Sequence, residues 1–287
     1  MTTNEINETA TLLAVTSDGR FIVSDTYEGH SAFLNVCFGS KSVLDIEDIA
    51  KKVGFSKGDI FVDLGANVGQ QIEPILSLGG IVHAFEPHPI IFSFLRDRHR
   101  TNKNVILNFA AADTENRNLP FYFKNNEYEI NGGASLYCGK TQMNRDPALD
   151  QKPTPTCETK TKDISEYIES IPSRIKILKI DTEGTEYDLI QRLMETDAIS
   201  KIDVILLEDH GGSFRGLEPW YNHAQTVLMN LTFAEDIFTK IILWNGNSNE
   251  NATNKKLAEL CEEFRDDAVN NSEKFLNNLR KERETSE

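Results

Sequence analysis

The chain has 287 residues and a mass of 32.4 kDa, enough for one large domain or two small ones with full cores. Its formal charge of -15 comes from 45 acidic and 30 basic side chains, which is the wrong sign for binding nucleic acid or an anionic membrane. The mean hydropathy is -0.40, and no apolar run approaches the roughly 18 residues of a membrane span, so we do not expect a transmembrane protein.

The cellular compartment is suggested by the start of the chain and by the cysteines. The first residues lack the basic and apolar regions of a secretory signal. The four cysteines lie far apart and form no CxxC pair, which argues against a zinc ribbon or a disulfide framework. We therefore expect a cytoplasmic protein with reduced thiols.

An extension over residues 1–54 precedes the main domain. Its short alternating apolar and polar segments, with an SDG turn between them, predict a β-hairpin. A helical pattern then begins near Ser42 and runs through about Lys52 before Gly54 ends it.

Residues 55–248 alternate apolar segments with helical patterns, which predicts a doubly wound α/β domain with a mostly parallel sheet. The expected strands are 59–64, 80–85, 104–110, 176–181, 201–208, 233–238 and 240–244. The last two of these are expected to form a hairpin. Expected helices follow Gly69, Pro89 and Pro219, and a further helix spans about 184–195.

Two segments depart from this alternation. Residues 124–160 are rich in Asn, Gly, Pro and Thr, and they are expected to be either a functional lid or a disordered insertion. Residues 249–287 begin with a linker and continue with an apolar stripe from Leu257 to Leu279, which predicts an amphipathic helix. We expect this helix to pack on the flank of its own domain, with a homodimer interface as the alternative.

The segment FVDLGANVGQQ indicates a nucleotide-type ligand. Gly65 and Gly69 lie where a strand turns into a helix, and Glu86 follows about twenty residues later, a spacing that both dinucleotide and methyl-donor enzymes use for the ribose. Gln70 stands where the dinucleotide fingerprint requires a third glycine. Asp63 would repel a pyrophosphate and attract the ammonium group of S-adenosylmethionine. The pattern therefore favours S-adenosylmethionine over a dinucleotide.

Four segments, VDLGANVGQ, AFEPHP, NGGASLY and ILKIDTEGTEYDLI, together resemble the FkbM-type methyltransferases over about residues 55–245. The resemblance implies a class I, Rossmann-like fold with seven strands, the last of them antiparallel, and S-adenosylmethionine as the methyl donor. By position, it places four residues at the methionine end of the donor, namely Asp63, Gly65, Asn67 and Gly69. It also places Glu86 on the ribose hydroxyls. Asp113 stands near the expected adenine position, although it could equally cap a turn.

The methyl acceptor is expected beyond the ends of the next two strands, beside Asp181 and Glu183 and beside Glu208, Asp209 and His210. A hydroxyl acceptor needs a base, and His210 titrates in the right range, with Asp181 or Glu183 acting directly or orienting the imidazole. The alternative for these acidic residues, and for Glu186, is that they cap the helix that follows.

A metal ion is a less favoured alternative at this end. Asp181, Glu208 and Asp209, together with His210, offer suitable oxygen and nitrogen ligands, but the resemblance implies no metal. The motif [DN]PP[YF] of base-methylating enzymes is absent from the chain, so we expect no nucleic acid as acceptor. The resemblance to the FkbM-type enzymes implies the hydroxyl of a small molecule or saccharide as the acceptor. The alternative functions are a nicotinamide-dependent oxidoreductase and a non-catalytic protein that binds S-adenosylmethionine and serves in an assembly.

Overall fold

The computed structural model describes residues 11–15, 21–24, 46–122, 133–137, 157–208, 210 and 240–244. Strands β1 (Thr11–Val15) and β2 (Phe21–Ser24) pair antiparallel, with Val15 opposite Phe21 at the turn end. The hairpin predicted from the SDG turn is therefore present. Helix α2 spans Ile46–Lys52, and it ends at the residue that the sequence predicted. Ser42, where we expected the helix to begin, lies outside the described residues.

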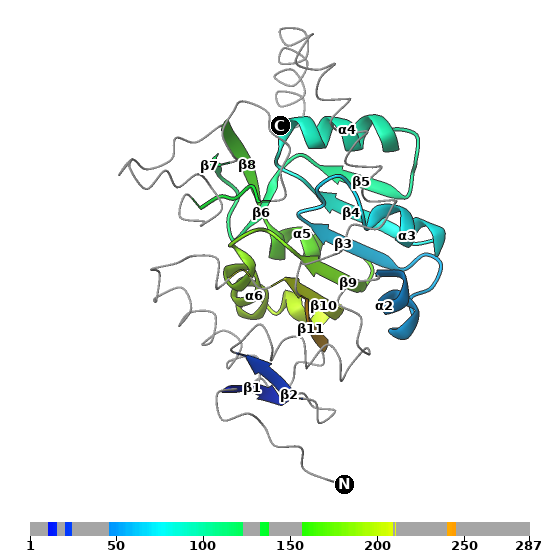
Figure 1. Ribbon diagram of the computed structural model, residues 1–287, viewed down its shortest axis with the longest axis vertical. Helices are drawn as coiled ribbons and strands as arrows, with labels where there is room; N and C mark the ends of the chain where they lie inside the picture. The colour runs from blue at the N-terminus through cyan, green and yellow to red at the C-terminus, as the bar shows by residue number, and fades with distance from the viewer. Residues whose placement is uncertain are drawn as a thin grey trace, which may run out of the picture.

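A six-stranded sheet forms the centre of the molecule, with its strands in the order β11-β10-β9-β3-β4-β5 (Figure 1). All five neighbouring pairs are parallel, so their carboxyl ends share one edge. The strands are β3 (Ile60–Leu64), β4 (Ile81–Phe85), β5 (Val105–Asn108), β9 (Ile175–Ile180), β10 (Ile202–Glu208) and β11 (Lys240–Trp244). The central strands are apolar because helices cover both of their faces.

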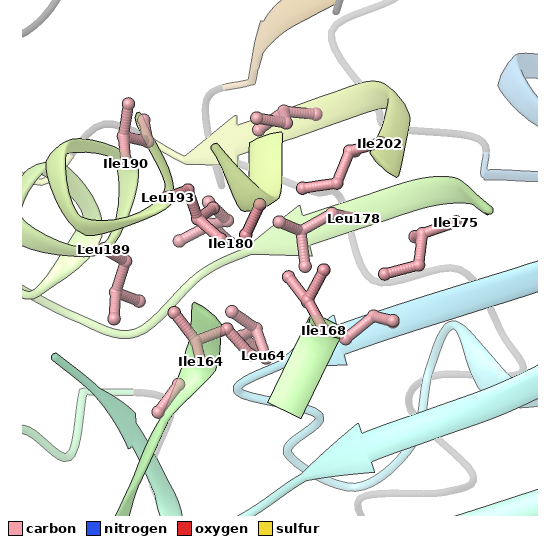
Figure 2. Packing of buried hydrophobic residues seen from close by; sticks show 14 of the residues in the cluster. Leu64, Ile164, Ile168, Ile175, Leu178, Ile180, Leu189, Ile190, Leu193 and Ile202 are labelled. Atoms are coloured by element: carbon pink, nitrogen blue, oxygen red, sulfur yellow. The ribbon is translucent and has the colours of Figure 1, made fainter. Parts of the chain in front are cut away.

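The two faces of the sheet have separate cores. On one face, helices α2, α3 (Ile72–Ser77) and α4 (Pro89–His99) pack over side chains such as Phe61 and Ile177. On the other face lie helices α5 (Ile164–Ser170) and α6 (Glu186–Glu195) and the 3-10 helix η1 (Ala198–Lys201). Figure 2 shows this second core, in which Ile168 lies beside Leu178 and Leu193 lies beside Ile180. The doubly wound α/β fold is therefore confirmed.

The last described strand differs from the expectation. We expected the sheet to end in an antiparallel strand, but β11 runs parallel to β10, with Glu208 opposite Trp244. A parallel neighbour needs a crossover of about a dozen residues or more, and residues 209–239 are enough for one. The expected strand at 233–238 and the helix after Pro219 lie outside the described residues, and so does the C-terminal helix with its dimer alternative.

A small second sheet was not predicted. Strand β8 (Cys157–Asp163) lies between β6 (Ala111–Asp113) and β7 (Asn118–Phe121), parallel to the first and antiparallel to the second. Its first residues fall inside the 124–160 segment that we expected to lack regular structure. Their sequence, CETK, is mostly polar and lacks the alternation of apolar and polar residues that predicts a strand, although buried and less buried side chains alternate along β8. This sheet brings Ala111 and Ala112 to the edge where the main strands end.

The described helices are short and mixed in polarity. Among them, none has the length and apolar character that a membrane crossing requires.

Candidate functional site

A pocket opens where β3, β4 and β9 end, at the edge that topology assigns to ligands. The space between its walls, with the open solvent at its mouth included, measures about 610 Å³. Polar groups from the strand ends face small and aromatic apolar side chains. The lining residues are Gly65, Asn67, Phe85, Glu86, Pro87, Ile91, Ala110, Ala111, Ala112, Phe121, Ala134, Leu136, Asp181, Thr182, Glu183 and Thr185.

Gly65 lets two strand ends approach each other at the floor of the pocket. Its φ is +83°, and a Cβ on this residue would overlap the carbonyl oxygen of Asp181. The turn is fixed on its other side because the backbone N–H groups of Gly65 and Ala66 both donate to the carbonyl of Phe85. Only glycine fits this position.

Glu86 directly follows β4, and its carboxylate lies against the same turn. Its Oε2 accepts the backbone N–H of Asn67 and its Oε1 accepts that of His88, each at 2.8 Å. Burial raises the pKa of Glu86 to about 7, although these two backbone donors oppose the rise. Each oxygen keeps a further lone pair, so the side chain can accept hydrogen bonds from two neighbouring hydroxyl groups of a ligand.

Two residues expected at the donor site lie beside the pocket. Gly69 is not among its lining residues, and a Cβ there would be 2.8 Å from Cδ2 of Leu95, so its lack of a side chain serves packing. Asp113 follows the three lining alanines, but its carboxylate pairs with the guanidinium of Arg117 at 2.9 Å.

Asp63 lies beneath the pocket and does not line it. Its side chain is fully buried, and its Oδ1 is 3.2 Å from Nζ of Lys179 on β9. Burial raises the pKa of Asp63, whereas the ammonium group of Lys179 lowers it. The ammonium that faces Asp63 in the structure is therefore that of Lys179, which sequence reasoning missed. Its only sequence signal is a charged residue in the apolar strand KILKI.

Lys179 also reaches the pocket floor. Its Nζ donates to Oδ2 of Asp181 at 2.9 Å and to the carbonyl of Gly65 at 3.2 Å. Burial opposes the charge on Lys179, but the carboxylates of Asp181 and Asp63 together raise its pKa. Conversely, burial opposes the charge on Asp181, and Lys179 lowers its pKa despite this. One ammonium thus bridges the ends of the two central strands.

His210 is surrounded by carboxylates from α6, from the loop that precedes α6 and from the end of β10. Its Nδ1 lies 2.9 Å from Oε1 of Glu186, and its Nε2 lies 2.9 Å from Oε2 of Glu183 and 3.5 Å from Oε1 of Glu208. Burial lowers the pKa of this imidazole, but the neighbouring carboxylates raise it overall. Burial, together with the charge of Asp181, raises the pKa of Glu208 to about 8.

The loop that begins α6 holds this arrangement together. Glu183 has φ +59°, a left-handed conformation that is costly outside glycine. Oε1 of Glu186 accepts the backbone N–H groups of Thr182 and Gly184, while Oγ of Ser135 donates to the carbonyl of Glu183 at 2.7 Å. Glu186 therefore caps the turn, which the sequence offered as an alternative, and also binds the histidine, which the sequence did not predict.

The structure thus brings most of the expected acceptor residues together. Ligand atoms of Asp181, Glu183 and His210 all lie within 4.8 Å of one another. Glu208 adjoins them, and Asp209 lies outside the described residues. Residues 133–137, from the segment expected to be a lid or an insertion, contribute Ala134 and Leu136 to the pocket wall.

Comparison with known proteins agrees with this geometry. A family model described as the methyltransferase FkbM domain matches residues 63–241, from the floor of the pocket to β11. No curated protein and no solved structure matched the chain. Because the matched segment covers more than half of the chain and carries the strand ends that form the pocket, the protein belongs to the FkbM family of methyltransferases.

Proposed function

We propose that the protein is an S-adenosylmethionine-dependent O-methyltransferase that acts on a hydroxyl group of a small molecule or saccharide. The observation that carries the proposal is one pocket with Glu86 on one side and Asp181 and Glu183 on the other, in a chain of the FkbM family. The net charge of -15 favours a small or neutral acceptor over nucleic acid. A cytoplasmic location stays a prediction from the sequence.

The residues of the pocket fit the donor. Glu86 offers free lone pairs on both carboxylate oxygens for the two ribose hydroxyls, and Ala110, Ala111 and Ala112 contribute small apolar side chains to the wall where adenine would lie. At Gly65, a side chain is excluded by the neighbouring backbone, so a ligand can approach the main chain closely. Asp63 would support this floor through Lys179 and would not touch the donor.

When bound, S-adenosylmethionine supplies a methyl carbon on a sulfonium, which an acceptor oxygen attacks as the carbon–sulfur bond breaks. The side chains of this chain then align the acceptor and take up its proton, as such a displacement requires. Asp181 and Glu183 line the pocket where the acceptor would enter, and His210 lies directly behind them. Glu186 orients the imidazole, so we assign proton uptake to the cluster of Asp181, Glu183 and His210.

Calorimetric titration with S-adenosylmethionine, S-adenosylhomocysteine and NAD tests the donor. We expect the two sulfur nucleotides to bind and NAD not to bind, and Glu86→Ala should weaken binding while the surface variant Glu73→Ala should not. Transfer of labelled methyl from S-adenosylmethionine to a panel of saccharides and hydroxylated small molecules then tests the reaction. Binding of NAD alone would contradict the proposal, and donor binding without transfer to any acceptor in the panel would favour the non-catalytic alternative.

A further inference from the structure

The inference concerns the imidazole of His210, which is 8% exposed and has carboxylates on both of its nitrogens. Its Nδ1 faces Glu186, while its Nε2 faces Glu183 at 2.9 Å and Glu208 at 3.5 Å. Carboxylate oxygens repel one another unless a positive charge lies between them, so the arrangement requires a cation or a proton at Nε2.

The hydrogen bonds of Glu186 determine which nitrogen of His210 carries a proton. Oε1 of Glu186 already accepts the backbone N–H groups of Thr182 at 3.1 Å and Gly184 at 3.0 Å, and backbone amides can only donate. The same oxygen therefore accepts from Nδ1 of His210, at 2.9 Å. In a neutral imidazole this leaves the lone pair of Nε2 directed toward Glu183, with no hydrogen between the two atoms.

A carboxylate that holds Nδ1 while Nε2 points at further oxygen ligands is the usual arrangement around a metal-bound histidine. The distances agree with this interpretation. Ligand atoms on adjacent corners of an octahedron lie about 3 Å apart when each is about 2.1 Å from the ion. Nε2 of His210 and Oε2 of Glu183 are 2.9 Å apart, and an oxygen of Asp181 lies within 4.8 Å of both residues' ligand atoms.

The ammonium of Lys179 does not take the place of such an ion. Its contacts with Asp63, Asp181 and the carbonyl of Gly65 all lie on the floor of the pocket. It therefore balances charge on the strand ends, and none of these three contacts involves Glu183 or His210. An ion would have a route of entry, because Asp181 and Glu183 line the open pocket.

We propose that Asp181, Glu183 and His210 bind a divalent transition-metal ion on the acceptor side of the pocket, with Glu186 orienting the histidine. Two carboxylates and one imidazole suit ions such as Mn²⁺ better than Ca²⁺, which prefers oxygen ligands alone. The role of the ion rests on the proposed function: an acceptor hydroxyl bound to it would lose its proton to water more readily. With the ion bound, His210 would be a ligand, and water would take up the proton that the cluster of Asp181, Glu183 and His210 accepts in the metal-free protein.

Binding of Mn²⁺ to the full-length protein, after EDTA treatment and removal of the chelator, tests the site by electron paramagnetic resonance. We expect one ion per chain, displaced by Zn²⁺ at lower concentrations than by Ca²⁺. Glu183→Gln and His210→Ala should weaken binding at least tenfold, and Glu186→Gln should weaken it about 10- to 100-fold, as loss of an orienting carboxylate does.

Glu166→Gln is the matched control, because Glu166 lies in a separate acidic surface groove with Asp188 and Glu195. It should leave Mn²⁺ binding unchanged. Circular dichroism and thermal melting establish that each variant is folded. Absence of stoichiometric Mn²⁺ binding to the folded parent protein, or binding that survives His210→Ala, would overturn the proposal in favour of a protonated imidazole.

The metal site and the methyl-donor site can fail separately in this design. Mn²⁺ binding is read without nucleotide, and S-adenosylhomocysteine binding is measured on the same metal-free protein. Loss of Mn²⁺ binding with donor binding intact would remove only the metal site. The opposite result would leave the metal site in place and overturn the proposed donor.

Discussion

Asp63 and Lys179 are direct register partners on the neighbouring strands β3 and β9, and their side chains form an ion pair of 3.2 Å in the interior. A charged pair at the centre of a sheet is costly to desolvate, so each partner depends on the other. Here the lysine also contacts Asp181 and the carbonyl of Gly65. The pair therefore fixes the two strand ends between which the pocket opens.

Replacement of Lys179 by Met should lower the free energy of unfolding by about 3–5 kcal/mol, because it leaves the buried charge of Asp63 without compensation. Urea denaturation measures this loss. Lys176→Met on the same strand is the control: Lys176 pairs with the partly exposed Asp203, and we expect a loss below about 1 kcal/mol. Addition of Asp63→Asn to Lys179→Met should restore part of the stability. Equal losses for the two lysines would contradict this account.

Gly65→Ala should both destabilise the protein and damage the pocket. Any L-residue at its positive φ costs about 1–2 kcal/mol, and here the new Cβ would also overlap the backbone of Asp181. Gly58 is the matched control, since its φ is +88° and no atom lies within 4 Å of the position that a Cβ would take. We expect Gly58→Ala to show the conformational cost alone and to bind S-adenosylhomocysteine normally. If both variants melt alike, the close approach at Gly65 is unimportant.

The pKa of about 7 for Glu86, raised by burial from 4.5, makes ligand binding depend on pH. Hydroxyl donors favour the ionised carboxylate, so S-adenosylhomocysteine should bind more weakly as the pH falls below 7, by up to about tenfold per unit. The folding stability of the ligand-free protein changes in the opposite direction. The folded state binds the proton of Glu86 more tightly than the unfolded chain does, so the contribution of Glu86 to the free energy of unfolding is lost as the pH rises from about 4.5 through 7.

Calorimetry between pH 5.5 and 8, in buffers of different ionisation enthalpy, measures the proton released on binding. Asp63 and Lys179 are the charged groups that act on Glu86, and Glu208 titrates nearby with a pKa of about 8. Comparison of Glu86→Gln with Glu208→Gln therefore assigns the effect. A pH profile that persists in Glu86→Gln would show that another group is responsible.

Ser135→Ala should loosen the wall of the pocket without unfolding the domain. The hydroxyl of Ser135 donates to the carbonyl of Glu183 and accepts the backbone N–H of Tyr137. Loss of such bonds costs about 0.5–1.5 kcal/mol each, so ligand affinity should fall roughly three- to tenfold. Ser170→Ala is the control, because its hydroxyl donates to the carbonyl of Tyr167 on an exposed helix turn away from the pocket. Identical affinities for the two variants would argue against a role for this segment.

Much of the central fold could be predicted because its signals are local. The apolar strands and the helices between them follow from the spacing of residues such as Phe61 and Val62, which are buried on opposite faces. The polar strand β8 was missed because its residues alternate between buried and exposed within a polar sequence. The orientation of β11 depends on the path of the chain after β10, which no local pattern determines.

The candidate site shows the same division. Glycine turns and strand-end acids singled out Gly65, Glu86 and Asp181 in the sequence, and the structure places all three at one pocket. The sequence could not show that Asp63 is directed at Lys179, because that contact depends on which residues face each other across two strands. The double role of Glu186 was likewise hidden, since its partner His210 comes from another strand end.

The bond between Lys179 and the carbonyl of Gly65 joins residues 114 positions apart in the chain. Contacts of such long range form late and slowly in folding, because a large loop must close before they contribute any stability. During synthesis, a chain that has emerged only as far as β5 already contains the glycine turn and Glu86 but lacks the strand that completes the floor. The protein should therefore bind S-adenosylhomocysteine only after β9 has docked beside β3. Binding of this ligand would then show that the whole sheet has folded.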